Sequence, residues 1–234
     1  MKKINYLWSN KTILWFLFLI LLVLMVGPLL IDHVMYGDIK VKNLQYRYYS
    51  KYVFIFLLLP ILSLVMTGQL SLYTRQDILI TSGSRDNYAK FILFKLILTS
   101  SLFILSYNIS TLFLSMLIDS VSPLYFLFEL KLFIGSWVLF LFVTSLYLVI
   151  FFQTNSLIIA FIVSISTPFI MIILNFYLGV PSYIMIVQEL SNIENNLTFW
   201  DIIPSGSCLF FISQALLWFS FYKISKKDFL NSSD

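Results

Sequence analysis

One stretch of this chain limits its fold more than any other: residues 132–188 contain no Asp, Glu, Lys or Arg over 57 positions. A helix that crosses a bilayer needs about 20 apolar residues, so this stretch is far too long for a single span. Its one polar interruption is Gln153-Thr-Asn-Ser156. We therefore predict two membrane-spanning helices joined by a tight turn, within an all-α fold.

The composition agrees with a polytopic membrane protein. The chain is 60% hydrophobic and 11% charged, whereas soluble domains carry about 25% charged residues. This leaves no room for a soluble catalytic domain. The net charge of +4 does not indicate nucleic-acid binding, because the basic residues lie beside the apolar runs and form no patch. The single cysteine, Cys208, lies in an apolar run and is predicted to be a buried small hydrophobic residue.

The same length criterion predicts six spans, which form one transmembrane domain over residues 1–234. The first apolar run lacks a small-residue cleavage site, so we interpret it as a retained span and not as a signal peptide. Residues 119–131 are predicted to be a short loop. The predicted spans cover residues 12–31, 52–74, 92–118, 132–152, 157–178 and 202–222.

The distribution of basic residues predicts the orientation. Six spans put both termini on one side, and the segments on that side hold ten Lys and Arg residues against five on the other side. Because cytoplasmic loops carry the excess of basic residues, we expect a multi-pass protein of the cell membrane with both termini in the cytoplasm. Residues 75–95 are then cytoplasmic, and residues 32–51 and 182–201 lie outside.

The longest polar break on the cytoplasmic side covers residues 74–90. Gly83 favours the left-handed conformation that ends a helix. Ser84 is placed to cap a second helix, with Asp86 in its first turn, where the helix dipole favours negative charge. That second helix is expected to run on into the third span. The alternative is an ordinary solvated loop between two spans.

Motifs for enzyme chemistry are absent from the sequence. It contains no Gly-x-x-x-x-Gly-Lys phosphate-binding loop and no His-Glu-x-x-His pair. Its only histidine, His33, lies at a predicted membrane edge and is interpreted as solvated. We therefore predict no catalytic residue, no metal site and no cofactor bound by this chain.

Two predicted spans carry polar residues at helical spacing. One interpretation is packing between helices, with the hydroxyl groups bonded to their own backbone. The other is a route through the membrane for an amphipathic substrate. The positions are Ser101, Asn108, Thr111 and Ser115 on the third span, and Ser164, Pro168, Met171 and Asn175 on the fifth.

The polar break also carries a family resemblance. An acidic residue, then leucine, then Ser-Arg, then a lysine before the next span is similar to the coupling-helix region of ABC-2 type transporter permeases. Asp77, Ser84, Arg85 and Lys90 match this pattern, and Ser82-Gly83 stands where a proline is usual. Together with the span count, the resemblance covers almost the whole chain. The residues expected to contact the ATPase are Arg75, Asp77, Ile78, Leu79, Gly83, Ser84 and Arg85.

The resemblance implies the permease subunit of an ATP-driven exporter. It implies a second permease subunit and separate ATPase subunits, which would bind the ATP and Mg. The implied cargo is an amphipathic or hydrophobic molecule such as a peptide, toxin, lantibiotic or lipophilic drug. An alternative is the substrate-capture component of a vitamin transporter, which is also small and six-span. A third interpretation, an intramembrane enzyme, is disfavoured by the missing histidines and acids.

Overall fold

A computed structural model describes residues 48–73, 84–118, 123–179, 182–191 and 199–226. These residues are helical apart from short connections, and none of them forms a strand. Five of the helical segments are long and apolar enough to cross a membrane, which confirms a polytopic all-α membrane protein. In chain order the elements are α3 (Lys51–Val53), the π-helical turn η1 (Phe54–Leu58), α4 (Leu59–Tyr73), α6 (Arg85–Ile118), α7 (Pro123–Thr154), α8 (Leu157–Leu178), α9 (Tyr183–Leu190) and α10 (Phe199–Lys226).

The five candidate spans correspond to the last five predicted ones. They cover Lys51–Tyr73, Arg85–Met116, Phe128–Thr154, Leu157–Leu178 and Ile203–Lys226. The fifth predicted span, residues 157–178, coincides with α8. The first predicted span, residues 12–31, lies outside the described residues.

The structure corrects one prediction about the connections and adds a helix to another region. The predicted loop over residues 119–131 is helical from Pro123 onward, because proline is well tolerated at the first position of a helix. The region 182–201, which was predicted only to lie outside the membrane, contains the short helix α9, and α10 begins at Phe199, three residues before the predicted start of the last span at residue 202. In residues 119–131 the charged residues near a membrane surface were taken for a loop, although those from Pro123 onward lie on a helix.

Local capping explains several helix ends. The backbone N–H of Asn87 donates to Ser84 Oγ over 3.2 Å, and Asp86 lies in the first turn of α6. The predicted Ser84 cap is thus confirmed, and α6 runs without a break into the third span. Between α7 and α8, Asn155 has a φ of 55° and Ser156 caps α8. Gly179, with a φ of 65°, ends α8 in the left-handed conformation.

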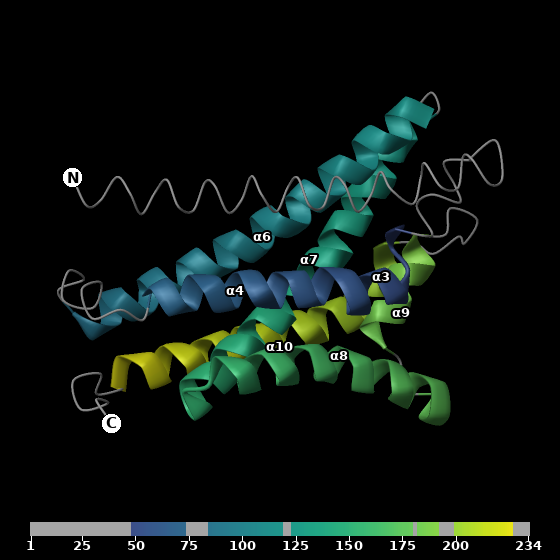
Figure 1. Cartoon of the computed structure of the whole chain (residues 1–234). Helices are drawn as coiled ribbons and strands as arrows, with labels where there is room; N and C mark the ends of the chain where they lie inside the picture. The colour runs from purple at the N-terminus through teal and green to yellow at the C-terminus, as the bar shows by residue number, and fades with distance from the viewer. Residues whose placement is uncertain (1–47, 74–83, 119–122, 180–181, 192–198, 227–234) are drawn as a thin grey trace, which may run out of the picture.

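The helix α7 lies at the centre of the bundle. In an apolar 18-residue stretch of its candidate span 72% of the residues are buried, compared with 17% in the corresponding stretch of α8. It packs mainly against α6, α8 and α10, and Figure 1 shows it passing through the middle of the bundle. The Phe140 ring on α7 is fully buried, with its centre 6.0 Å from that of Phe54 and 5.8 Å from that of Phe103.

The helices α8 and α10 expose broad apolar faces. Phe176 on α8 and Phe211 on α10 are among the most exposed large hydrophobic residues. In a bilayer such faces meet lipid tails or another subunit without cost. Cys208 on α10 is also exposed, so the prediction that it is buried was wrong. An apolar run in a membrane helix includes a lipid-facing side, and hydropathy alone does not say which residues lie on that side.

Candidate functional site

The polar break identified in the sequence is described only at its end. Arg75, Asp77, Ile78, Leu79 and Gly83 lie outside the described residues. Ser84 and Arg85 are described, and both are exposed at the start of α6. The next two residues, Asp86 and Asn87, are exposed as well. The first turn of α6 therefore presents a continuous polar surface at one end of the bundle.

The helices on either side of this break are tied together. The Tyr88 hydroxyl donates a hydrogen bond to the backbone carbonyl of Tyr73 over 3.0 Å. One turn further along α6, the Phe91 ring meets the Tyr73 ring edge to face, with centres 5.4 Å apart. Tyr73 and Tyr88 are both buried. The end of α4 and the start of α6 are thus packed firmly against each other. The sequence pattern did not predict these contacts.

The predicted polar face of α6 is buried in the bundle. Asn108, Thr111 and Ser115 are all buried. Thr111 and Ser115 donate to backbone carbonyls three and four residues earlier, over 2.8 Å in each case. Ser101 is half-buried and accepts a 2.8 Å hydrogen bond from Trp137 Nε1 on α7. These contacts are those of helix packing, one of the two interpretations of this face.

The main partner of this face is Tyr49, which precedes α3. Its hydroxyl donates to Asn108 Oδ1 and lies 3.3 Å from Thr111 Oγ1. The Asn108 amide nitrogen in turn donates to the Ile104 carbonyl over 2.7 Å. Beside it, the Tyr107 hydroxyl donates to the Tyr48 carbonyl over 2.6 Å. Hydrogen bonds from the Tyr49 and Tyr107 hydroxyl groups therefore join the segment before α3 to the middle of α6.

A buried carboxylate lies near this cluster. Glu129 on α7 is buried and close enough to Tyr107 to act on it electrostatically. Sequence reasoning missed it, because Glu129 was assigned to the predicted loop 119–131. Ionisable residues buried in membrane helices are usually conserved for function or paired with a partner.

The predicted polar residues of α8 follow two different arrangements. Ser164 is buried and lies 3.2 Å from Ser63 on α4, hydroxyl to hydroxyl. Asn175 is only half-buried, near the end of α8, where its carbonyl accepts the backbone N–H of Gly179. The bundle does not bring Asn175 into the α6 cluster, because α7 packs extensively against both α6 and α8.

Further polar pairs join α4 to its neighbours. The Thr67 and Tyr147 hydroxyl groups lie 2.7 Å apart, and Thr99 donates to Gln69 Oε1 over 2.8 Å. The paired residues are 80 and 30 positions apart in the sequence. Sequence periodicity identifies a polar face on one helix, but it does not identify the partner, so these pairs were missed.

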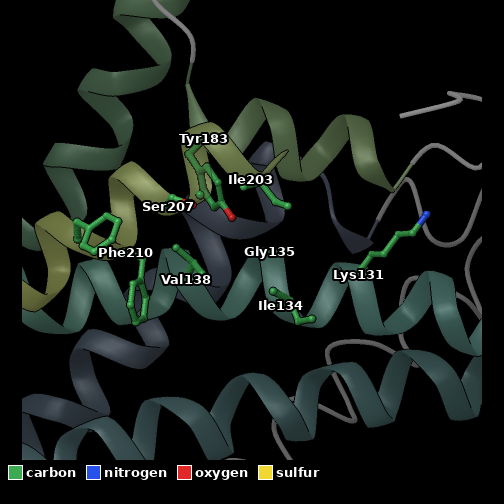
Figure 2. Close-up of a pocket in the computed structure, with 10 residues that line it drawn as sticks. Lys131, Ile134, Gly135, Val138, Tyr183, Ile203, Ser207 and Phe210 are labelled. Carbon is green, nitrogen blue, oxygen red and sulfur yellow. The ribbon is translucent and has the colours of Figure 1, made fainter. Parts of the chain in front are cut away.

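A cavity opens between α7, α9 and α10. Its volume is about 250 Å³, and most of its walls are apolar (Figure 2). Tyr183, at the start of α9, is buried and extends toward α7. Burial raises the pKa of Tyr183 to about 12, so its hydroxyl stays a hydrogen-bond donor at physiological pH. The lining residues are Lys131, Ile134, Gly135, Val138, Tyr183, Ile203, Gly206, Ser207, Phe210 and Phe211.

Comparisons of the chain with protein-family models, with curated proteins and with solved structures found no match. Within the described ranges, no three His, Cys, Asp or Glu side chains converge in a way that would hold a metal ion.

Proposed function

We propose that this chain is the membrane-spanning permease subunit of an ATP-driven exporter of the ABC-2 type. Residues 74–85 would contact a separate ATPase subunit, which binds the ATP and Mg. The observation that carries this proposal is the exposed polar first turn of α6, at the head of one continuous helix of 34 residues. Such a helix joins a polar surface at one end to the interior of the membrane domain.

The length of α6 suits this role. At 1.5 Å per residue, 34 residues span about 51 Å, well beyond the hydrocarbon thickness of about 30 Å. A helix of this length reaches out of the bilayer even when it is tilted. The contact between Tyr88 and Tyr73 would make α4 and α6 move together when a partner pushes on the polar break.

Inside the membrane domain, α6 leads from its polar first turn to the buried polar cluster around Asn108. A displacement of α6 along its axis would act directly on Tyr49, whose hydroxyl is bonded to Asn108. Polar contacts of this kind have discrete partners, so they suit a switch between two packed arrangements. In this proposal, ATP-driven closure of the ATPase pair would shift the domain between inward-facing and outward-facing states.

The cargo class follows from the interior of the bundle. Its described spans carry uncharged hydroxyl and amide groups, with few charges, which suits an amphipathic or hydrophobic cargo better than an ion. The exposed apolar faces of α8 and α10 leave room for a second permease subunit. We place the protein in the cell membrane with both termini in the cytoplasm, as the basic residues predict.

The proposal is tested by reconstitution. We expect the purified chain to hydrolyse no ATP, and vesicles that hold it together with an ATPase from a neighbouring reading frame to move a fluorescent amphipathic peptide when ATP is added. An ATPase whose phosphate-binding lysine is replaced serves as the control. ATP hydrolysis by the purified chain alone contradicts the proposal. Tight binding of a water-soluble vitamin without the ATPase would favour the vitamin-capture alternative.

A second prediction concerns the route through the membrane. If Asn108 and Asn175 line it, then Asn108→Leu and Asn175→Leu should each reduce peptide export about tenfold, equivalent to roughly 1.4 kcal/mol in the transport barrier. Both variants should still bind the ATPase. Tyr49→Phe is the matched control, since it removes the hydrogen bond to Asn108 and keeps the amide. If Tyr49→Phe reduces export as much as Asn108→Leu does, the amide acts through helix packing.

A further inference from the structure

The residues that line the cavity between α7, α9 and α10 change in character from one end of the cavity to the other. Lys131 lies near the start of the α7 span, and Val138 lies seven residues, or about 10 Å, deeper along the helix. On α10 the lining runs in the same sense, from Ile203 at the start of the span to Phe210 and Phe211. Figure 2 shows Lys131 at one end and Phe210 at the other. The cavity therefore changes from cationic at the membrane surface to aromatic inside.

Two polar groups of the cavity have no partner among the described residues. Tyr183 is 7% exposed, and no hydrogen bond to its hydroxyl occurs within the described part of the chain. The Lys131 ammonium likewise has neither an ion pair nor a hydrogen bond there. The Tyr183 side chain is largely buried and its hydroxyl is open to the cavity, where a ligand or a water molecule can accept its hydrogen bond. Both groups are donors, so both suit an anionic acceptor.

The apolar part of the cavity is open toward the lipid. Phe211 is 71% exposed, while Phe210 packs against Trp137, with ring centres 6.4 Å apart, and closes the inner end. At about 250 Å³ the cavity is smaller than the roughly 300–1,000 Å³ that encloses a drug-sized ligand. It is suited to one segment of an acyl chain whose remainder stays in the bilayer.

Glycine at position 135 lets α9 lie close to α7. A Cβ atom at Gly135 would lie 3.4 Å from Leu190 Cδ1 and 3.9 Å from Tyr183 Oη. A larger side chain would therefore push α9 outward and widen the site. The close approach of α9 holds the Tyr183 hydroxyl over the cavity.

We propose that this cavity binds one anionic phospholipid from the leaflet that α9 faces, with its phosphate between Lys131 and Tyr183 and one acyl chain against Val138 and Phe210. Lysine near the end of a membrane helix extends toward the headgroup level, where it meets phosphate. This site does not depend on an ATPase or on transport. In the topology proposed above, the leaflet is the outer one.

The test is lipid titration of the purified full chain in detergent, followed by native mass spectrometry. We expect phosphatidylglycerol to bind about fivefold more tightly than phosphatidylcholine, the advantage of one lysine beside an anionic headgroup. Lys131→Gln should abolish this preference, and Lys131→Arg should retain it. Lys51→Gln is the matched control, because Lys51 lies outside the cavity.

A second variant tests the apolar part. Ser207→Trp fills the cavity and should reduce the binding of both lipids, with an unchanged elution profile and thermal midpoint showing that the protein is folded. The proposal is wrong if Lys131→Gln keeps the preference for phosphatidylglycerol. It is also wrong if inorganic phosphate displaces the lipid at millimolar concentration, or if Ser207→Trp changes the oligomeric state and leaves lipid binding intact. The last result would mean that a second copy of the chain covers the cavity.

Discussion

Replacing Ile78 and Leu79 together with alanine is expected to abolish stable binding of the ATPase. Interfaces concentrate their energy in a few buried anchors, and each truncation costs about 1–4 kcal/mol. Two such losses lower the affinity at least tenfold, and export should fall with it. Insertion should be unaffected, because both residues belong to the polar break between α4 and α6, outside the candidate spans.

The measurement is co-purification of the ATPase together with ATP-driven export in the same vesicles. Ile158→Ala/Ile159→Ala is the matched control. These residues lie in the first turn of α8 and are 71% and 45% exposed. The alternation of the spans puts them at the same membrane face as residues 74–83. Full retention of the ATPase by the Ile78/Leu79 variant, with coupled export, would show that the polar break is only a connector.

Phe140→Ala is expected to destabilise the bundle by about 3 kcal/mol, the lower end of the range for truncating a buried phenylalanine. The ring is fully buried between Phe54 and Phe103. In a membrane the separated helices keep their side chains in lipid, so the water-exclusion term is small. The lost contacts and the remaining cavity still carry a cost.

Unfolding of the purified protein in mixed micelles with increasing denaturing detergent measures this effect. Phe113→Ala on α6 is the matched control, because that ring is 59% exposed and should contribute less than about 1 kcal/mol by the same reasoning. Equal destabilisation by the two variants would mean that α7 does not form the packed centre of the bundle.

The sequence predicted the spans well where both ends carry local signals. The predicted limits of α8 coincide with the helix because Ser156 caps its start and Gly179 ends it. The start of α6 at Ser84 was predicted for the same reason. These signals involve residues within four positions of one another, so a sequence is sufficient to recognise them.

Features that depend on distant parts of the chain were not predictable in this way. The helix α9 lies at the end of a long charge-free run, and hydropathy does not separate it from a span or a loop. Tyr49 and Asn108 are 59 positions apart, and nothing in either local pattern pairs them. The cavity combines residues from α7, α9 and α10, so it exists only once the three helices are packed.

Because Cys208 is exposed, the natural protein can be labelled at a single site without introducing a cysteine. It is the only cysteine in the chain, and it lies on α10 directly after Ser207, which lines the cavity. A membrane-permeant thiol reagent will therefore place one spin label or fluorophore at one known position, with no background cysteines to remove. Oxidative crosslinking at that position would record directly whether the α10 helices of two copies of the chain meet.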